Sequence, residues 1–236
     1  MDCIVYEMSI TVYIQKNIRS YESNNYISSL IDKTLSKDKH FLNLHTKNSF
    51  KSYCFNNLYP MASDHVYKEG SICTFKIRSL DKNFVDYIKS NLINEYTNEL
   101  KVLSIKTKPI AKKHIEKLVS ITPIVVTYRE GYWRGKHTVE ELESRIINNL
   151  RKKYHYYTGV TLPDEIDMFT SFKFKNRKPI PTKYKDIYLL GDKIEFKVAN
   201  NPIAQELAYL SLATSLGEKG GRGFGFANYI WMPRIV

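Results

Sequence analysis

The chain has 236 residues, of which 43% are hydrophobic, so it can bury a core in one large domain or in two domains of ordinary size. Its 36 lysine and arginine residues exceed its 24 aspartate and glutamate residues, and the formal net charge of +12 favours a polyanionic partner such as nucleic acid. The sequence shows neither an apolar run of about 18 residues nor a signal-type segment, so we expect a cytoplasmic protein without a membrane partner.

The first half of the chain predicts the element order β-α-β-β-α-β. Residues 6–15 alternate like a half-buried strand, and residues 24–36 place apolar side chains at helical spacing. Segments 50–59 and 71–80 predict a pair of strands, 81–100 an amphipathic helix, and 101–110 a closing strand. This order is that of the ferredoxin-like unit.

The second half repeats this order without obvious sequence similarity to the first. Segment 115–130 predicts a strand, 138–157 a helix, and the basic segment 167–198 further strands that include a hairpin. A second helix follows over 201–216, with Asn201 as its cap and Pro202 in its first turn, and then a glycine-rich loop and a final strand. We therefore expect an α+β fold of two tandem ferredoxin-like (RRM-like) domains, 1–110 and 111–236, with the charged connector 106–113 between them.

The glycine-rich segment 217–229, GEKGGRGFGFANY, raises the question of a phosphate-binding loop. A nucleotide-binding loop runs from a strand into a helix, and a Walker loop also needs a lysine beside a serine or threonine, whereas this loop follows a helix and enters a strand. Residues 222–229 instead match the RNA-recognition octamer K/R-G-F/Y-G/A-F-V-x-F/Y except for an alanine in place of the valine. The alternative is a glycine-rich turn that leads into a buried aromatic strand. We predict that the loop contacts RNA through Lys219, Gly221, Arg222, Gly223 and Gly225.

A second basic segment, FKFKNRKPIPTKYK (172–185), carries Lys173, Lys175 and Arg177 at alternate positions. Strand geometry would place these cations largely on one face, which suits binding to an RNA stem. The alternative is a solvated sheet edge that lysines protect from unwanted pairing.

The aromatic and cysteine contents bear on the same question. The 18 tyrosines and 11 phenylalanines offer faces on which unpaired bases stack, although an A/T-rich genome also yields chains rich in lysine, asparagine, isoleucine and tyrosine. The three cysteines lack C-x-x-C spacing, which argues against a zinc cluster or a disulfide framework. We expect buried thiols in a reducing compartment, and we expect no metal and no other cofactor.

The chain carries a resemblance to a known family in two segments. A basic, tandem ferredoxin-like chain with a helix, a glycine-rich loop and the sequence GFGF near its end resembles the repeat-associated RNA-binding superfamily of CRISPR systems. Segment 45–60, HTKNSFKSYCFNNLYP, in which a histidine precedes an F-K-x-[FY]-x-F strand, resembles the Cas6 family of CRISPR-associated endoribonucleases. This resemblance implies cleavage of precursor CRISPR RNA within each repeat to give mature guide RNAs.

The resemblance also implies roles for individual residues. His45 matches the catalytic histidine of the family, and Lys51 falls where some members place a supporting lysine. The tyrosine that many members carry on the preceding helix is not found, and Tyr26, near the start of that helix, is a substitute for it. His40 is the alternative histidine, although its flanking lysines fit a solvated turn equally well.

The implied reaction needs few groups. RNA supplies its own nucleophile, the 2′-hydroxyl, so cleavage requires a base, an acid and a cation for the phosphate charge, without a metal. A histidine whose pKa is near the usual value of about 6.5 can serve as base or acid. The products would be a 2′,3′-cyclic phosphate and a 5′-hydroxyl.

Three hypotheses about function remain from the sequence. The first is a metal-independent endoribonuclease that processes CRISPR RNA; the second is a non-catalytic RNA-binding scaffold subunit of a CRISPR effector complex. The third is an unrelated basic RNA-binding protein. The expected partners are CRISPR repeat RNA, as precursor and as mature crRNA, and other effector-complex subunits, and the expected state is a monomer or homodimer.

Overall fold

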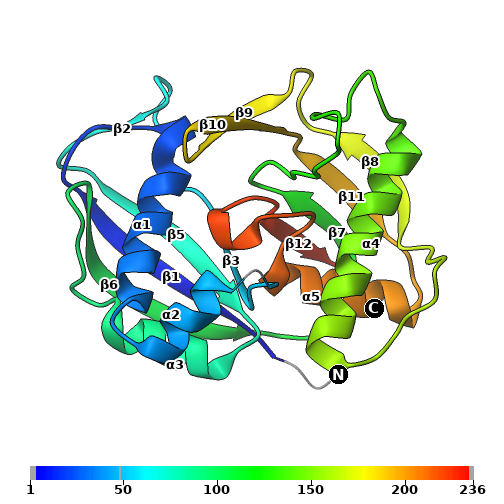
Figure 1. The fold of residues 1–236 in the computed structure, drawn as a ribbon, viewed down its shortest axis with the longest axis horizontal. Helices are drawn as coiled ribbons and strands as arrows, with labels where there is room; N and C mark the ends of the chain where they lie inside the picture. The colour runs from blue at the N-terminus through cyan, green and yellow to red at the C-terminus, as the bar shows by residue number, and fades with distance from the viewer. Residues whose placement is uncertain (1–3, 48, 234–236) are drawn as a thin grey trace.

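Each half of the chain forms one four-stranded antiparallel sheet with helices packed on it, as the sequence predicts (Figure 1). The computed structural model describes residues 4–47 and 49–233, and the side chains of residues 44–46 lie outside the described part. Strands β3, β5, β1 and β6 form the first sheet, in that order, and strands β12, β7, β11 and β8 form the second. Both orders are those of a ferredoxin-like unit, so the tandem ferredoxin-like fold is confirmed. The division into separate domains 1–110 and 111–236 stays a prediction.

Among its described residues, the first half contains six strands, three α-helices and one short 3-10 helix. The sheet strands and the two helices between them follow the ferredoxin-like order, and the remaining elements are additions. In chain order the elements are β1 (Val5–Ile14), β2 (Ile18–Arg19), η1 (Ser20–Glu22), α1 (Ser23–Leu35), α2 (Lys39–Thr46), β3 (Tyr53–Phe55), β4 (Val66–Tyr67), β5 (Ile72–Ser79), α3 (Lys82–Asn91) and β6 (Leu100–Ile110).

The second half has the same order with a hairpin, β9 and β10, inserted between the second and third strands of its sheet. The helix α5 begins as predicted, because the Asn201 side chain accepts a hydrogen bond from the Ala204 amide and Pro202 occupies the first turn. The elements are β7 (Ile115–Ser120), α4 (Val139–Thr158), β8 (Phe169–Phe174), β9 (Ile180–Tyr184), β10 (Ile187–Gly191), β11 (Ile194–Val198), α5 (Pro202–Thr214), η2 (Gly220–Arg222) and β12 (Ala227–Trp231).

Several predicted boundaries were wrong, each for a local reason. The helix predicted over 81–100 ends at Asn91, and Asn94 has a left-handed backbone with φ of 62°. The strand predicted over 115–130 ends at Ser120, shortly before Pro123, which has no amide hydrogen for a sheet. The connector predicted over 106–113 is shorter, because β6 pairs with β1 as far as Ile110. Helix α2 was not predicted; the Asp38 side chain caps it by accepting hydrogen bonds from two amides of its first turn.

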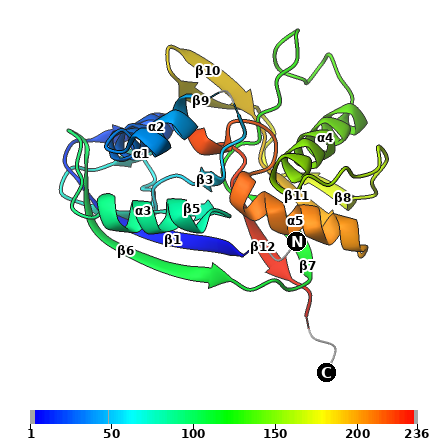
Figure 2. The same cartoon turned by 60° about the horizontal axis from the view of Figure 1, so that its bottom comes forward.

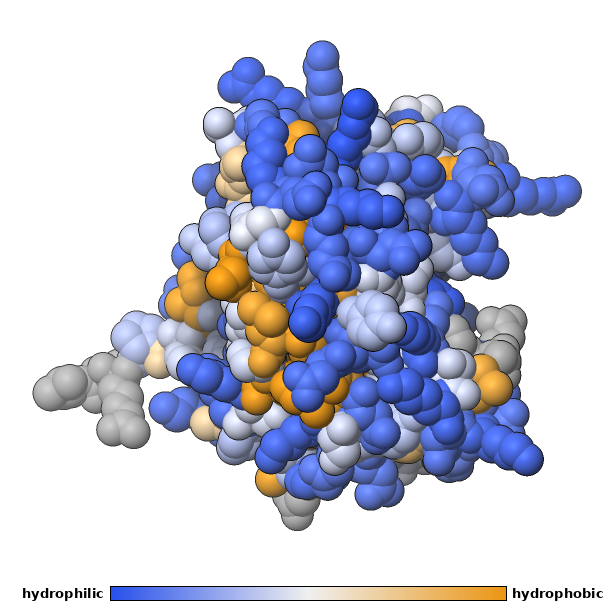
Figure 3. Space-filling model, turned by 90° about the vertical axis from the view of Figure 1, so that its left-hand side faces the viewer, coloured by the Kyte–Doolittle hydropathy of each residue, from blue (hydrophilic) through white to orange (hydrophobic). Residues whose placement is uncertain are grey.

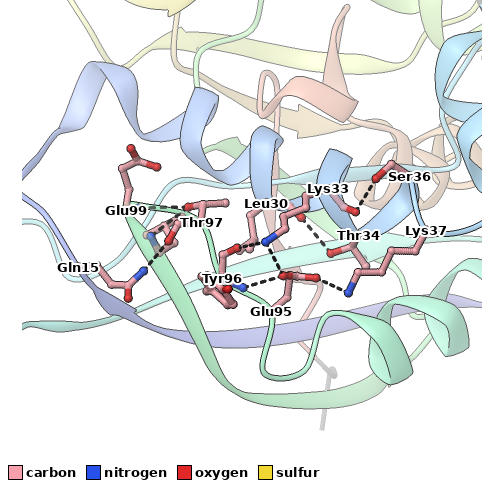
Figure 4. Close-up of polar contacts among 11 residues, drawn as sticks. Gln15, Leu30, Lys33, Thr34, Ser36, Lys37, Glu95, Tyr96, Thr97 and Glu99 are labelled. Carbon is pink, nitrogen blue, oxygen red and sulfur yellow. Dashed lines mark hydrogen bonds and ion pairs between the residues drawn. The ribbon is translucent and has the colours of Figure 1, made fainter.

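The connection after α3, where the helix predicted over 81–100 does not continue, is held by a polar network (Figure 4). The buried Glu95 carboxylate pairs with Lys33 and Lys37, which both lie at or just beyond the C-terminal end of α1. Lys33 also donates a hydrogen bond to the Tyr96 carbonyl, at 2.7 Å. Burial by itself would raise the pKa of Glu95, but hydrogen bonds from Lys37, Lys33 and the Tyr96 amide outweigh burial and lower this pKa to about 2. The network therefore fixes the α3–β6 connection against α1.

Edge strand β6 and the α3–β6 connection lie on the left-hand side of the molecule in Figure 1, and Figure 3 shows this side as mostly hydrophilic with an apolar patch near its middle. Leu103 is 41% exposed, yet Lys101, Lys106 and Lys108 are also exposed along the same strand. Lysines on an edge strand oppose pairing with another chain. We infer that this edge is protected by charge.

The two halves pack through a buried ion pair and through α5. Figure 2 shows α1 and α4 on one side of the molecule and strands β1, β6, β7 and β12 on the other. Arg78 of β5 and Glu7 of β1 are 1% and 2% exposed, and their side chains pair at 2.8 Å. Arg78 also donates to the Ala227 carbonyl of β12 at 2.7 Å and lies over the Phe226 ring. A charged pair of the first sheet thus anchors the last strand of the second.

Helix α5 also contacts the first sheet directly. The buried Cys54 thiol donates a weak hydrogen bond to the Leu212 carbonyl, and the Tyr209 hydroxyl donates to the Ile110 carbonyl at 2.7 Å. Cys54 and Cys73 are both buried, as expected, and the third cysteine, Cys3, lies outside the described residues. Within residues 4–47 and 49–233, no helix combines the length and the apolar character needed to span a bilayer.

Candidate functional site

The glycine-rich loop between α5 and β12 crosses from the second half of the molecule to the first. Its Gly223 carbonyl accepts a hydrogen bond from the Asn24 side chain of α1 at 3.2 Å. Arg222 pairs with Asp32 of the same helix, with Nη1 2.7 Å from Oδ2. The loop is therefore held at the junction of the two halves (Figure 1).

Two glycines of the loop have backbone conformations and surroundings that exclude a side chain. Gly223 has φ of 84°, and a Cβ atom there would lie 2.6 Å from the Phe55 ring. Gly225 has φ of 64°, and a Cβ atom there would lie 1.8 Å from the Leu216 carbonyl oxygen. Phe224 and Phe226 are fully buried. Packing alone thus accounts for these glycines and aromatic residues, and RNA contacts at Gly223 and Gly225 stay a prediction.

A cleft of about 300 Å³, which we call the central cleft, lies between this loop, α4 and the α2–β3 connection. Four cationic side chains of the described residues line it, together with one carboxylate, Glu218, which is engaged by hydrogen bonds from Thr127. The β9–β10 hairpin closes one side, because its Tyr184 also lines the cleft. The excess of positive charge suits a phosphate group. The cations are Lys51, Lys153, Lys219 and Arg222.

Lys51 links the loop to the end of α2. A Cβ atom on Gly221 would lie 3.1 Å from Lys51 Cγ, so the lysine stem packs against the loop backbone. The Lys51 ammonium donates a hydrogen bond to the Lys47 carbonyl at 2.7 Å. Burial, and then the charge of Arg222, lower the pKa of Lys51. Three of the predicted RNA-binding residues, Lys219, Gly221 and Arg222, therefore share one site with the predicted catalytic residue Lys51.

Lys153 of α4 is a residue that sequence reasoning missed. It is 5% exposed, and its ammonium donates three hydrogen bonds, to the carbonyls of Thr214, Ser215 and Gly217, at 2.7 to 2.9 Å. Burial lowers the pKa of Lys153 to about 7. Its position three residues after the buried Leu150 places it on the apolar face of α4, which is the signal that could have revealed it.

Comparison with known proteins identifies the family. A match to the family described as "CRISPR associated protein Cas6, C-terminal" covers residues 105–229, which is more than half of the chain. The chain belongs to the Cas6 family. Membership supports a role in CRISPR-associated RNA processing. A search of curated protein sequences found no match.

Solved structures show the fold of this Cas6-family chain. One described as "CRISPR associated protein Cas6" has a TM-score of 0.71 at 22% identity, over 96% of this chain and 99% of that one. Another, "An RAMP protein binding different RNA substrates", has a TM-score of 0.72 at 18% identity, over 95% and 99%. A Cas6-related protein from Pyrococcus furiosus has a TM-score of 0.68 at 18% identity, over 96% and 98%.

The predicted catalytic residues of this Cas6-family protein lie on different elements. His45 belongs to α2, two residues before the carbonyl that Lys51 contacts, and its side chain lies outside the described part. His40 is exposed near the start of the same helix. Tyr26 packs against the core of the first half; burial and then the charge of Glu22 raise its pKa. Asn24, two residues before Tyr26 on α1, contacts Gly223 of the glycine-rich loop, but Tyr26 is not among the described residues that line the central cleft, and its catalytic role stays a prediction.

The predicted basic strand lies apart from the central cleft. Lys173 faces Glu195 across the β8–β11 pair, and Lys175 pairs with Glu195 at 3.2 Å. Phe196, the neighbour of Glu195, is buried in the core with α5, so the lysines point to the opposite face of the sheet. Arg177 follows the end of β8 and is exposed, so the three cations do not share one strand. Lys219, by contrast, lies over the Tyr184 ring at the cleft.

Proposed function

We propose that this Cas6-family protein is an endoribonuclease that cleaves precursor CRISPR RNA within its repeats and releases mature guide RNAs. The supporting observation is the position of Lys51. Its ammonium contacts the carbonyl two residues beyond His45, and its stem packs on Gly221 of the glycine-rich loop. The end of α2 and a cationic cleft are thereby joined in one place, as a proton-transfer group and a phosphate-binding group must be.

In the proposed reaction the substrate supplies the nucleophile. A base removes the proton of a 2′-hydroxyl, the 2′-oxygen bonds to the adjacent phosphorus, and the bond from phosphorus to the 5′-oxygen breaks. An acid protonates the departing 5′-oxygen, which leaves a 2′,3′-cyclic phosphate and a 5′-hydroxyl. We assign the proton transfer to His45 and the neutralisation of the phosphate charge to Lys51, with Arg222 beside it. No step of this reaction calls for a metal.

The RNA would contact the protein on two surfaces. Lys219, Gly221 and Arg222 would hold the phosphates next to the cut in the central cleft. Lys173 and Lys175 lie on the open face of the second sheet, where they would bind a more distant part of the repeat, together with Arg177. Replacing Lys173 should therefore weaken binding and reduce its salt dependence without changing the rate of the bound complex.

The test is cleavage of the host's own repeat RNA by the purified protein in EDTA, with the product ends mapped. We expect cleavage to persist in EDTA. His45→Ala should slow single-turnover cleavage by at least about 100-fold, the usual scale of acid-base catalysis, and leave RNA affinity within a few-fold. His40→Ala is the matched control, since this histidine lies on the same helix, and it should cleave normally. Lys51→Ala should lower rate and affinity moderately, because a phosphate contact acts in both the ground and the transition state.

Each other outcome has a definite meaning. Loss of cleavage on chelation, restored by magnesium, contradicts the metal-free reaction. An inactive His40→Ala beside a fully active His45→Ala protein would move the site to His40, and full activity of both would end the histidine mechanism. Tight binding of repeat RNA without any cleavage would identify a non-catalytic scaffold subunit instead.

A further inference from the structure

A second cavity adjoins the central cleft, and no step of the proposed reaction uses it. We call it the aromatic cavity; its volume is about 150 Å³, and the α2–β3 connection separates it from the cleft. Ser49, Phe50, Lys51 and Tyr53 line both spaces, so they form a common wall. Six aromatic side chains line the cavity: Phe41, Phe50, Tyr53, Phe84, Tyr156 and Tyr157.

The lining of the cavity is mostly aromatic, and it also includes Ser49, Ser52, Lys51 and Asp81. Tyr156 of α4 is 52% exposed, and its ring meets the half-buried Phe50 edge-to-face at 5.7 Å. The Tyr157 hydroxyl is buried and has no hydrogen-bond partner within the described residues. Burial raises the pKa of Tyr157, so the hydroxyl stays protonated and can donate. A buried hydroxyl without a partner costs free energy unless a ligand satisfies it.

The dimensions and the chemistry fit a flat, heteroaromatic ligand. A cavity of about 150 Å³ with mostly aromatic walls is large enough to accept a benzene ring. Aromatic side chains stack with any base, and a hydroxyl can bond to the edge of one. A nucleotide carries its base and its phosphate on different sides of the ribose. A phosphate near Lys51 in the central cleft would therefore leave its base next to the common wall.

We propose that the aromatic cavity binds one unstacked nucleobase of the RNA, next to the phosphate in the central cleft. This inference rests on the proposed function, since it takes CRISPR repeat RNA as the ligand. Phe50 and Tyr156 stack on the base at the mouth of the cavity, and the Tyr157 hydroxyl donates to its edge. The protein thereby selects both the position of the bound strand and the identity of one base.

The test combines protein variants with abasic RNA. Affinity is measured for repeat RNA made uncleavable by a 2′-deoxy sugar at the mapped cut, or for intact RNA if the wild-type protein does not cut it. Abasic nucleotides are placed one at a time along the repeat. The protein variants are Tyr156→Ala and Tyr157→Phe, with Tyr96→Ala as the control, because Tyr96 is 58% exposed and lies outside the cavity.

At one position the abasic RNA should bind at least about fivefold more weakly, and Tyr156→Ala should cause a similar loss with intact RNA. The two losses should not add, because both remove the same stacking contact. Tyr157→Phe should keep the stacking but weaken discrimination among bases at that position, and Tyr96→Ala should leave affinity unchanged.

Losses that add at every position would overturn the cavity assignment and leave the proposed cleavage untouched. Equal losses in the Tyr156→Ala and Tyr96→Ala proteins would overturn it as well. Cleavage is measured separately, so an inactive protein that shows the non-additive loss contradicts only the nuclease proposal. Failure of the wild-type protein to bind repeat RNA would overturn both.

Discussion

Gly225 makes the closest backbone contact in the glycine-rich loop, so the Gly225→Ala substitution tests whether the loop packs as described. Gly225 donates to the Pro123 carbonyl and accepts from the Leu216 amide, so both of its backbone groups are fixed. A Cβ atom would lie 1.8 Å from the Leu216 oxygen, whereas nonbonded carbon atoms sit at about 3.5 to 4 Å. The left-handed φ of 64° adds about 1 to 2 kcal/mol for any residue with a side chain. We expect a loss of more than about 4 kcal/mol in the free energy of unfolding, a size that only severe defects reach.

Gly135→Ala is the matched control for this prediction. Gly135 also has a positive φ, of 78°, but no atom lies within 4 Å of a Cβ placed there. Its replacement should therefore cost only the conformational share, about 1 to 2 kcal/mol. Urea unfolding followed by tryptophan fluorescence measures the stability of both variants, because Trp133 and Trp231 lie in the same half of the chain as Gly225 and Gly135. If Gly225→Ala unfolds at the same urea concentration as Gly135→Ala, the steric argument is refuted.

Three further predictions concern buried charged groups. The pKa of Glu95 is lowered from 4.5 to about 2, so its ion pairs stabilise the fold at pH values above 4.5, and this stabilisation is lost as the pH falls toward 2. The urea concentration at the unfolding midpoint should therefore fall between pH 4.5 and 2, and it should fall less in the Glu95→Gln protein. Arg78→Met leaves Glu7 buried with weaker partners and should cost about 3 kcal/mol, and adding Glu7→Gln should recover part of that loss in the same assay. Lys153→Met should lower the thermal unfolding midpoint, because three buried carbonyls lose their hydrogen-bond donor and each loss costs about 1 to 3 kcal/mol of stability. An unchanged midpoint would contradict the three hydrogen bonds.

The ferredoxin-like order could be predicted because hydrophobic periodicity and capping residues act locally. Asn201 and Pro202 mark the start of α5 in the sequence, and the structure has the same cap. The end of α3 could not be predicted in this way. The stretch after Asn91 keeps helical composition, and it leaves the helix because Glu95 pairs with Lys33 of α1 and with Lys37 just beyond α1, which are distant in sequence. Tertiary contacts of this kind override local propensity.

The site was predictable in its parts and not in its arrangement. Lys51 and Gly221 were both predicted, but their contact depends on how the two halves pack, which no sequence pattern reveals. The alternation of Lys173, Lys175 and Arg177 predicted one shared face, yet β8 ends at Phe174 and leaves Lys175 and Arg177 in the connection that follows. An alternating pattern predicts a face only as far as the strand continues.

Helix α1 explains why the cleft depends on both halves. In each ferredoxin-like unit, the connection between the second helix and the last strand must dock somewhere. In the first half, this connection docks on the helix of its own unit, where Glu95 pairs with Lys33. In the second half, the corresponding connection is the glycine-rich loop, and it docks on α1 of the other unit, where Arg222 pairs with Asp32.

Asp32 and Lys33 are neighbours in α1 and point about 100° apart around the helix, so one helix can hold two loops on adjoining faces. The Lys33–Glu95 network fixes the rotation of α1 within the first half, and this rotation sets the direction in which Asp32 presents its carboxylate to Arg222. A rotation of α1 that improved one contact would weaken the other. The position of the glycine-rich loop, and with it the wall of the central cleft, is therefore decided partly by a polar network on an adjoining face of the helix.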